Sequence, residues 1–215
     1  MQTCQDKDRV AAPAALPVPA YLVERRMGSM TTGNDLSFVM PQPASVLRSL
    51  DLDRMDALAR LLVKRIPAGT TLGLVGTLGA GKTALVRAIA GACGVDVADV
   101  TSPTFTLLQS HHGTLTIHHL DAYRLADEDE FLELGVEELF EDQRAWTVVE
   151  WADRVAAVMP AATLWLRIDI EPHDLGSDRP NAGGHDHDDA LRSVTLGSAD
   201  RSLARIAATI ASDLA

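Results

Sequence analysis

The octapeptide GTLGAGKT, residues 76–83, decides the fold of this chain of 215 residues. Gly76, Gly81, Lys82 and Thr83 fill the fixed positions of the Walker A pattern G-x-x-x-x-G-K-[S/T]. The glycines allow backbone N–H groups to turn inward around phosphate oxygens, and a helix that follows adds the partial positive charge of its N-terminus. The octapeptide therefore predicts a site for the phosphates of a nucleoside triphosphate.

The segments on both sides of this loop have the patterns that a Walker A motif requires. Residues 70–76 form a short, mostly apolar run, which is typical of a strand buried on both faces, and residues 82–93 predict a helix. Upstream, apolar residues at spacings of three and four over residues 52–66 predict an amphipathic helix, with Ser49 or Asp51 as its cap. The loop is therefore expected to join a buried strand to a helix.

Two side chains of the loop are expected to contact the nucleotide and its metal ion directly. We expect Lys82 to reach the β- and γ-phosphates and the Thr83 hydroxyl to bind Mg²⁺. Adenine is favoured over guanine because no guanine-reading N/T-K-x-D pattern follows the loop. The predicted cofactors are therefore ATP and Mg²⁺. The loop residues expected to bind the nucleotide are Gly76, Leu78, Gly79, Ala80, Gly81, Lys82, Thr83 and Ala84.

The composition restricts the classes of protein to which the chain can belong. Hydrophobic residues make up 47% of the chain and charged residues 23%, and no apolar run reaches the roughly 18 residues of a membrane-spanning helix. The formal net charge of −11 disfavours direct binding to nucleic acid, which requires clustered Lys and Arg. The two cysteines and the lack of a signal-peptide pattern fit a reducing cytoplasm. We therefore expect a cytoplasmic protein that binds neither membrane nor DNA and leaves any other nucleic acid to a partner.

The chain divides into an extension and one domain. Residues 1–43 are punctuated by proline and lack a long apolar period, so we expect a disordered N-terminal extension. Residues 44–215 are the expected P-loop domain, of α/β class, with a polar loop insertion at about 171–190. The stretch GGHDHDD at 183–189 contains residue types that bind metals, but its glycines favour a polar loop.

Two further strand patterns end on a carboxylate. Residues 114–125 contain a strand pattern that ends at Asp121, and residues 145–151 contain one that ends at Glu150. Ligands collect at the C-terminal ends of strands in open α/β sheets. One acid is therefore expected to bind Mg²⁺, and the other to position the attacking water or to relay the nucleotide state. The residues interpreted as packing or strand-surface residues, rather than ligands, are His118 and His119.

The segment TSPTFTLL at 101–108 allows two interpretations. In P-loop proteins this region often carries a switch segment whose Ser or Thr senses the γ-phosphate, and Ser102 and Thr104 are the candidates. Alternatively, Pro103 sets a plain turn before a strand at 105–108. The spacing alone favours neither interpretation.

Five short motifs occur in a fixed order along the chain: LGAGKT (78–83), SPTF (102–105), H-x-D-x-Y-R (119–124), LG (134–135) and VEW (149–151). In this order and at these spacings they resemble the TsaE family, the bacterial ATPases of the tRNA threonylcarbamoyladenosine pathway. The resemblance extends over about residues 45–197. SPTF, D-x-Y-R and VEW together make it specific. Two positions depart from the family pattern: Thr77 replaces a frequent Asp, and Ala122 replaces Leu.

The resemblance implies a small α/β P-loop fold with a mixed central sheet flanked by helices. It also implies that Thr83 and Glu150 hold Mg²⁺ and that Asp121 is the acid required for catalysis. Thr104 would lie in the switch-like segment, and Trp151 would shape the nucleotide site. The catalytic residues implied in this way are Asp121, Lys82 and Thr104.

The resemblance further implies an activity and partners. Members of this family hydrolyse ATP slowly alone and act on a complex of TsaB and TsaD. In that complex, TsaD transfers the threonylcarbamoyl group to adenosine 37 of tRNAs that read ANN codons. The chain would reset or remodel the complex between turnovers and would meet tRNA only indirectly, which agrees with its acidic charge.

Two other function classes compete with this one. A P-loop small-molecule kinase would need an Arg-rich lid, and only EDQRAW at 141–146 has a suitable placement, with a single Arg. A nucleotide-gated binding module would bind ATP without needing Asp121, so substitution of Asp121 distinguishes it from an ATPase. The sequence leaves the source of an arginine finger undecided among Arg124, Arg144, Arg154 and a partner protein.

Overall fold

The computed structural model describes residues 38–172 and 190–214, which belong to one compact unit. The predicted extension, apart from residues 38–43, lies outside the described residues, as do most of the predicted polar insertion and the whole GGHDHDD stretch. Residues 38–43 contact the domain, since the aromatic rings of Phe38 and Trp165 have their centroids 4.5 Å apart. The described fold therefore begins before residue 44.

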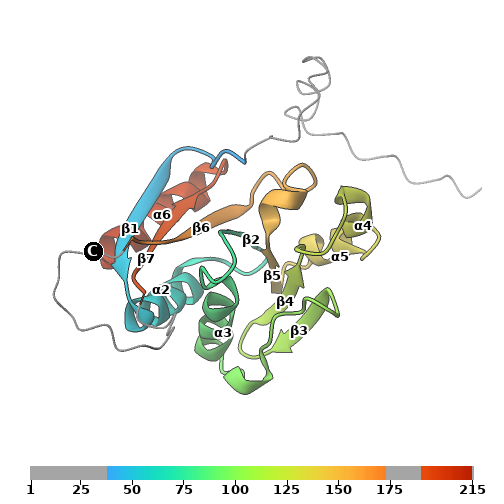
Figure 1. Ribbon diagram of the computed structural model, residues 1–215, viewed down its shortest axis with the longest axis horizontal. Coiled ribbons are helices and arrows are strands. Elements are labelled where there is room, and N and C mark those ends of the chain that lie inside the picture. The colour runs from blue at the N-terminus through green and yellow to red at the C-terminus, as the bar shows by residue number, and fades with distance from the viewer. Residues whose placement is uncertain (1–37, 173–189, 215) are drawn as a thin grey trace, which may run out of the picture. The chain divides into compact units, whose positions relative to one another are not determined.

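Among the described residues, seven strands form one sheet at the centre of the domain (Figure 1). They are β1 (Ala44–Leu50), β2 (Thr71–Val75), β3 (Leu108–His112), β4 (Thr116–Asp121), β5 (Ala145–Glu150), β6 (Leu164–Ile170) and β7 (Arg192–Gly197). Their order in the sheet is β1-β7-β6-β2-β5-β4-β3. β2 pairs in parallel with β5 and β6, and β4 with β5, whereas β1, β3 and β7 join by antiparallel pairing. The mixed sheet implied by the family resemblance is confirmed.

Helices cover both faces of this sheet (Figure 1). They are α2 (Leu52–Arg65), α3 (Lys82–Ala92), α4 (Glu128–Leu132), α5 (Val136–Glu141) and α6 (Arg201–Leu214), with 3-10 turns η2 (Val97–Asp99) and η3 (Ala152–Val155). The buried side chains of α2, α3 and α6 pack in one core with Leu74 of β2, whereas those of α4 and α5 pack in a second core with Val75. Successive residues of β2 thus face opposite cores, as the strand pleat requires.

The elements predicted around the Walker A loop are confirmed. The strand predicted at 70–76 is β2, whose residues are all buried, and the helix predicted at 82–93 is α3. The helix predicted upstream is α2. The Asp51 carboxylate caps it by accepting a hydrogen bond of 2.9 Å from the backbone N–H of Arg54. Local sequence patterns were sufficient to identify these elements.

The second interpretation of residues 101–108, a turn followed by a strand at 105–108, is wrong in the position of its strand. This segment forms a turn, and β3 begins only at Leu108. The backbone N–H of Leu107 donates a 2.6 Å hydrogen bond to the Pro103 carbonyl, and Leu107 has a positive φ of 64°. The backbone therefore curls back before the strand starts, and 83% of the Phe105 surface is exposed.

The parallel strands end at one edge of the sheet, where the Walker A loop lies. β2, β4, β5 and β6 run in the same direction, so their C-terminal ends meet there. A Cβ added at Gly76 would collide with the carbonyl oxygen of Ile168 on β6, so only glycine lets the loop leave β2 this close to β6. β7 runs in the opposite direction, so its first residues lie at this same edge.

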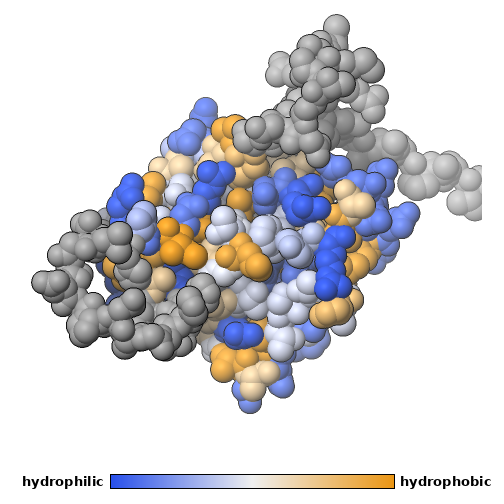
Figure 2. All heavy atoms as spheres, in the orientation of Figure 1, coloured by the Kyte–Doolittle hydropathy of each residue, from blue (hydrophilic) through white to orange (hydrophobic). Residues whose placement is uncertain are grey.

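Figure 2 shows how hydrophobic residues are distributed on one face of the domain. On the face drawn in Figure 2, the hydrophobic residues of the described part lie in separate groups between hydrophilic ones. The most exposed large hydrophobic residues include Leu78 in the Walker A loop and Phe105 in the turn that precedes β3. Within residues 38–172 and 190–214, every helix is too short or too polar to cross a lipid bilayer.

Candidate nucleotide-binding site

Lys82 is buried at the start of α3 and contacts the loop that precedes it. Its Nζ donates hydrogen bonds to the carbonyl oxygens of Gly76, at 2.7 Å, and Thr77, at 3.0 Å. The ammonium group also lies 3.6 Å from the centroid of the Trp151 ring, in a cation–π contact. The lysine is therefore held inside the loop, as a Walker A lysine must be to reach a bound phosphate.

The surroundings of Lys82 act on its charge in two opposing ways. Burial is the larger influence and lowers the pKa of Lys82. The carboxylates of Glu150, Asp121 and Asp153 oppose this shift because they attract the protonated amine. A phosphate oxygen would attract the amine in the same way, so the position suits a polyanionic ligand.

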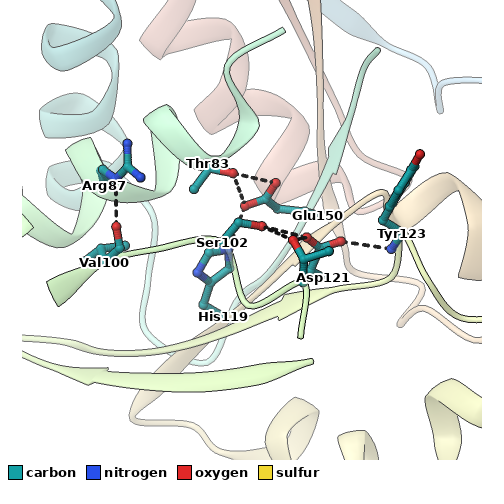
Figure 3. Close-up of polar contacts among 9 residues, drawn as sticks. Thr83, Arg87, Val100, Ser102, His119, Asp121, Tyr123 and Glu150 are labelled. Carbon is teal, nitrogen blue, oxygen red and sulfur yellow. Dashed lines mark hydrogen bonds and ion pairs between the residues drawn. The ribbon is translucent and has the colours of Figure 1, made fainter. Parts of the chain in front are cut away.

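The Thr83 hydroxyl and the Glu150 carboxylate meet beside Lys82 (Figure 3). Thr83 Oγ1 donates to Glu150, whose two carboxylate oxygens lie 2.8 and 3.0 Å away. The end of β5 and the first turn of α3 bring the two side chains together. Among the described residues, no cluster of three or more His, Cys, Asp or Glu side chains could hold a metal ion. The pair nevertheless fits Mg²⁺, which usually takes one or two carboxylates and completes its coordination with phosphate and water.

His119 is a site residue whose role the sequence analysis missed. Its ring is fully buried, which agrees with the predicted packing role, but its Nε2 lies 2.8 Å from Glu150 Oε1. A carboxylate only accepts, so Nε2 carries the hydrogen of this bond. His119 thereby orients the same carboxylate that accepts from Thr83. One weak sequence signal existed: His119 stands two positions before Asp121 on β4, so the two side chains share a face.

Three donors hold the Asp121 carboxylate (Figure 3). Its Oδ2 accepts from Ser102 Oγ at 2.7 Å and from Thr104 Oγ1 at 2.9 Å, and its Oδ1 accepts from the backbone N–H of Tyr123 at 2.9 Å. The two hydroxyl oxygens lie 2.8 Å from each other. The SPTF segment is therefore a turn whose polar side chains are bound to Asp121.

Trp151 is half-buried and packs between Lys82 and Tyr123. It follows Glu150 in a left-handed backbone conformation, with a φ of 57°. Its ring contacts the Lys82 ammonium, and its centroid lies 4.8 Å from that of the Tyr123 ring. The structure therefore brings these predicted site residues together at one edge of the sheet: Gly76, Lys82, Thr83, Thr104, Asp121, Glu150 and Trp151.

The remaining loop residues of the prediction contribute no polar side chain. Leu78 and Gly79 are exposed in the loop, and Ala84 is exposed on α3. Ala80 is buried, and its backbone N–H donates to the Thr77 carbonyl at 3.2 Å. Any contact of these residues with a nucleotide must involve the main chain or apolar surface.

The three candidate arginine fingers lie in different surroundings. The Arg124 guanidinium stacks over Phe105, 4.2 Å from the ring centroid. Arg154 donates to the Leu125 carbonyl at 2.9 Å, and Arg144 is exposed. Arg124 is therefore the candidate that contacts the SPTF segment.

Comparison with known proteins agrees with the resemblance carried by the motifs. The family model described as threonylcarbamoyl adenosine biosynthesis protein TsaE matches residues 49–179, more than half of the chain. The tRNA threonylcarbamoyladenosine biosynthesis protein TsaE of Treponema pallidum is 39% identical over 102 residues, which cover 47% of this chain and 74% of that protein. The protein of the same name in Bacillus subtilis is 35% identical over 122 residues, or 56% of this chain and 75% of that protein.

A solved structure supports the predicted fold class. The crystal structure of Bacillus subtilis YdiB superimposes with a TM-score of 0.59 and covers 82% of this chain and 99% of its own. The two sequences are 23% identical in this comparison, so the likeness concerns the fold. The prediction of an α/β P-loop fold is confirmed.

Proposed function

The chain belongs to the TsaE family, and on that premise we propose that it is a Mg²⁺-dependent ATPase that acts on a complex of TsaB and TsaD. The family serves tRNA threonylcarbamoyladenosine biosynthesis, so tRNA modification is the process in which the chain takes part. One observation carries the proposal: the Walker A loop, the Thr83–Glu150 pair and the Asp121 carboxylate lie at one edge of the sheet. One site thereby contains the groups that would bind phosphate, hold the metal ion and position the attacking water.

The Walker A loop binds the phosphates of ATP through its backbone and through Lys82. Backbone N–H groups at the N-terminus of α3 attract an anion because the helix leaves them without internal partners. The Lys82 ammonium exchanges its bonds to the Gly76 and Thr77 carbonyls for phosphate oxygens, which are stronger acceptors because they are charged. The cation–π contact with Trp151 keeps the lysine from swinging away from the loop.

Thr83 and Glu150 would hold Mg²⁺, and His119 would keep the Glu150 carboxylate in place. The Thr83 hydroxyl gives its hydrogen to Glu150, so its lone pairs are available to the ion. When bound, Mg²⁺ neutralises charge that develops on the phosphates. His119 contributes by fixing Oε1 of Glu150, an oxygen that also accepts from Thr83.

Asp121 would position the attacking water. Three hydrogen bonds fix the orientation of its carboxylate, and two of them come from the SPTF segment. A shift of this segment when the γ-phosphate binds or leaves would therefore change the partners of Asp121. Such a link allows the nucleotide state to be read at the surface, where Phe105 of the same segment is exposed.

The charge of the chain supports an indirect role toward tRNA. A net charge of −11 opposes contact with a polyanion, so TsaB and TsaD would hold the tRNA while this chain supplies the ATP-driven step. The proposed place of action is the cytoplasm. Neither membrane nor DNA is a proposed partner.

The proposed function is tested by ATP turnover of the purified chain, alone and mixed with TsaB and TsaD of the same organism. We expect slow turnover that rises in the mixture and is lost in Lys82→Ala. Turnover that is indifferent to both partners would contradict the proposed partners and leave a P-loop ATPase. Transfer of phosphate to a metabolite instead of water would indicate a kinase, and ATP binding without turnover would indicate a nucleotide-gated module.

Substitution of His119 is expected to raise the Mg²⁺ concentration that ATP hydrolysis requires. His119→Phe removes the donor to Glu150 Oε1, so the Mg²⁺ concentration for half-maximal ATP hydrolysis should rise about tenfold. His119→Gln retains an N–H donor of similar reach and should recover most of the loss. The matched control is His118→Gln, on the opposite face of β4, which should leave the Mg²⁺ dependence unchanged. Equal Mg²⁺ dependence in His119→Phe and the parent chain would refute this role.

A further inference from the structure

Arg192 reaches the Walker A loop from the far end of the chain. It is the first residue of β7, and β7 starts at the edge of the sheet where the Walker A loop lies. Its side chain is 5% exposed, and its Nε donates to the carbonyl oxygen of Ala80 at 3.2 Å. Arg192 lies outside all five sequence motifs and beyond the matched family segment, which ends at residue 179.

The hydrogen bond from Arg192 to the Ala80 carbonyl determines the direction in which the backbone N–H of Gly81 points. A trans peptide is planar, so its C=O and the following N–H point in opposite directions. Because the Ala80 carbonyl faces Arg192, the Gly81 N–H points away from Arg192. The guanidinium is close behind this peptide, since a Cβ added at Gly81 would lie 3.2 Å from Arg192 Nε. Arg192 therefore favours the orientation of the Ala80–Gly81 peptide in which the Gly81 N–H points away from the guanidinium.

A Walker A loop binds phosphate with backbone N–H groups that converge on the ligand. Gly81 has a φ of 108°, a backbone angle that glycine adopts readily. Because glycine is this permissive, the residue itself does not hold the peptide before it in one orientation. The loop peptide thus needs an external contact to keep its orientation before a ligand arrives. An arginine provides it well, because its guanidinium is planar and rigid. Its Nη1 is also anchored to the Ala190 carbonyl at 2.6 Å, while its Nε donates to Ala80.

We propose that Arg192 is a positioning residue for phosphate binding, which holds the Ala80–Gly81 peptide so that the Gly81 amide faces the phosphates. This inference rests on the proposed binding of ATP at the Walker A loop. The buried guanidinium also places positive charge directly behind the loop, where it favours an anion. Arg192 acts through the loop backbone, so it affects binding of the triphosphate more than the chemical step.

The test compares Arg192→Lys with a matched control, Arg167→Lys. Lysine keeps the charge of Arg192 but lacks the planar group whose separate nitrogens bind the Ala80 and Ala190 carbonyls at the same time. Arg167 also donates to a backbone carbonyl, that of Phe38. It lies on β6 and shares a sheet face with Trp165 of the second core, whereas Arg192 lies on the other face of the sheet. Calorimetric titration with ATP and with inorganic triphosphate measures affinity, single-turnover hydrolysis measures the chemical step, and thermal unfolding without ligand measures stability.

We expect Arg192→Lys to bind ATP and inorganic triphosphate about tenfold more weakly, by the same factor for both, with single-turnover hydrolysis of bound ATP within about twofold of the parent. Arg167→Lys should bind both ligands like the parent chain. Parent-like affinity in Arg192→Lys, with a lowered unfolding temperature, would overturn the proposal and leave Arg192 a packing role. If the parent itself binds neither ligand, the proposed function fails, and this inference fails with it.

A second variant and a second observable keep the test decisive if Arg192→Lys does not fold. Arg192→Gln keeps one N–H donor without the charge, and its affinities are interpreted in the same way. In ¹⁵N-labelled full-length protein, the Gly81 amide signal should shift strongly when inorganic triphosphate is added to the parent chain. A folded Arg192 variant should show a smaller shift at saturation. An identical shift in parent and variant would show that Arg192 does not orient this amide.

Discussion

Lys82→Ala is expected to weaken ATP binding by about 2 to 5 kcal/mol, or at least roughly thirtyfold, and to remove measurable turnover. The variant loses the only buried ammonium among the described residues, and the carboxylates of Glu150 and Asp121 then act on the phosphates without it. Repulsion from these acids adds to the loss of the phosphate contact. Titration calorimetry with ATP, together with a steady-state turnover assay, measures both effects.

Lys64 supplies the matched control for this prediction. It is an exposed lysine in the last turn of α2, so Lys64→Ala makes the same change of charge and volume away from the site. We expect Lys64→Ala to bind and hydrolyse ATP like the parent chain. ATP affinity in Lys82→Ala within about threefold of the parent, in a variant that remains folded, would be incompatible with a Walker A role for this loop.

The parts of the fold near the Walker A loop were predictable because their signals are local. The apolar run of β2, the glycines of the loop and the pattern of α3 follow one another in the sequence, so each supports the others. The meeting of Asp121 and Glu150 was also predictable. Both acids end a parallel strand, and parallel strands place their ends at one edge of a sheet.

The parts that the sequence analysis missed depend on pairing between distant residues. β1 is an edge strand in which only Leu47 and Leu50 are buried, at an irregular spacing, so it lacks the apolar run that identifies an inner strand. The bond from His119 to Glu150 spans 31 positions, and that from Arg192 to Ala80 spans 112. Contacts of this kind follow from strand order and register, which no local pattern specifies.

Asp121→Asn is expected to lower ATP hydrolysis by about 100-fold or more while ATP affinity stays within about threefold of the parent. Asparagine has the shape of aspartate, and its oxygen can still accept from the backbone N–H of Tyr123. Its NH₂ group meets the Ser102 and Thr104 hydroxyls, which can rotate to accept instead of donate. The turn therefore keeps its contacts, and the loss is confined to the carboxylate charge that would position water. Single-turnover hydrolysis and calorimetric binding separate the two quantities.

Asp153→Asn is the matched control, because Asp153 also acts on the charge of Lys82 but belongs to η3, outside the Asp121 cluster. If the loss of negative charge near Lys82 were the cause of the slower hydrolysis, both substitutions would slow hydrolysis alike. We expect hydrolysis by Asp153→Asn to stay within about twofold of the parent. A loss of ATP affinity in Asp121→Asn as large as that in Lys82→Ala would instead assign Asp121 to nucleotide binding. Unchanged hydrolysis in Asp121→Asn would require another group to position the water, and the hydroxyls of Ser102 and Thr104 would then be the nearest polar side chains to test.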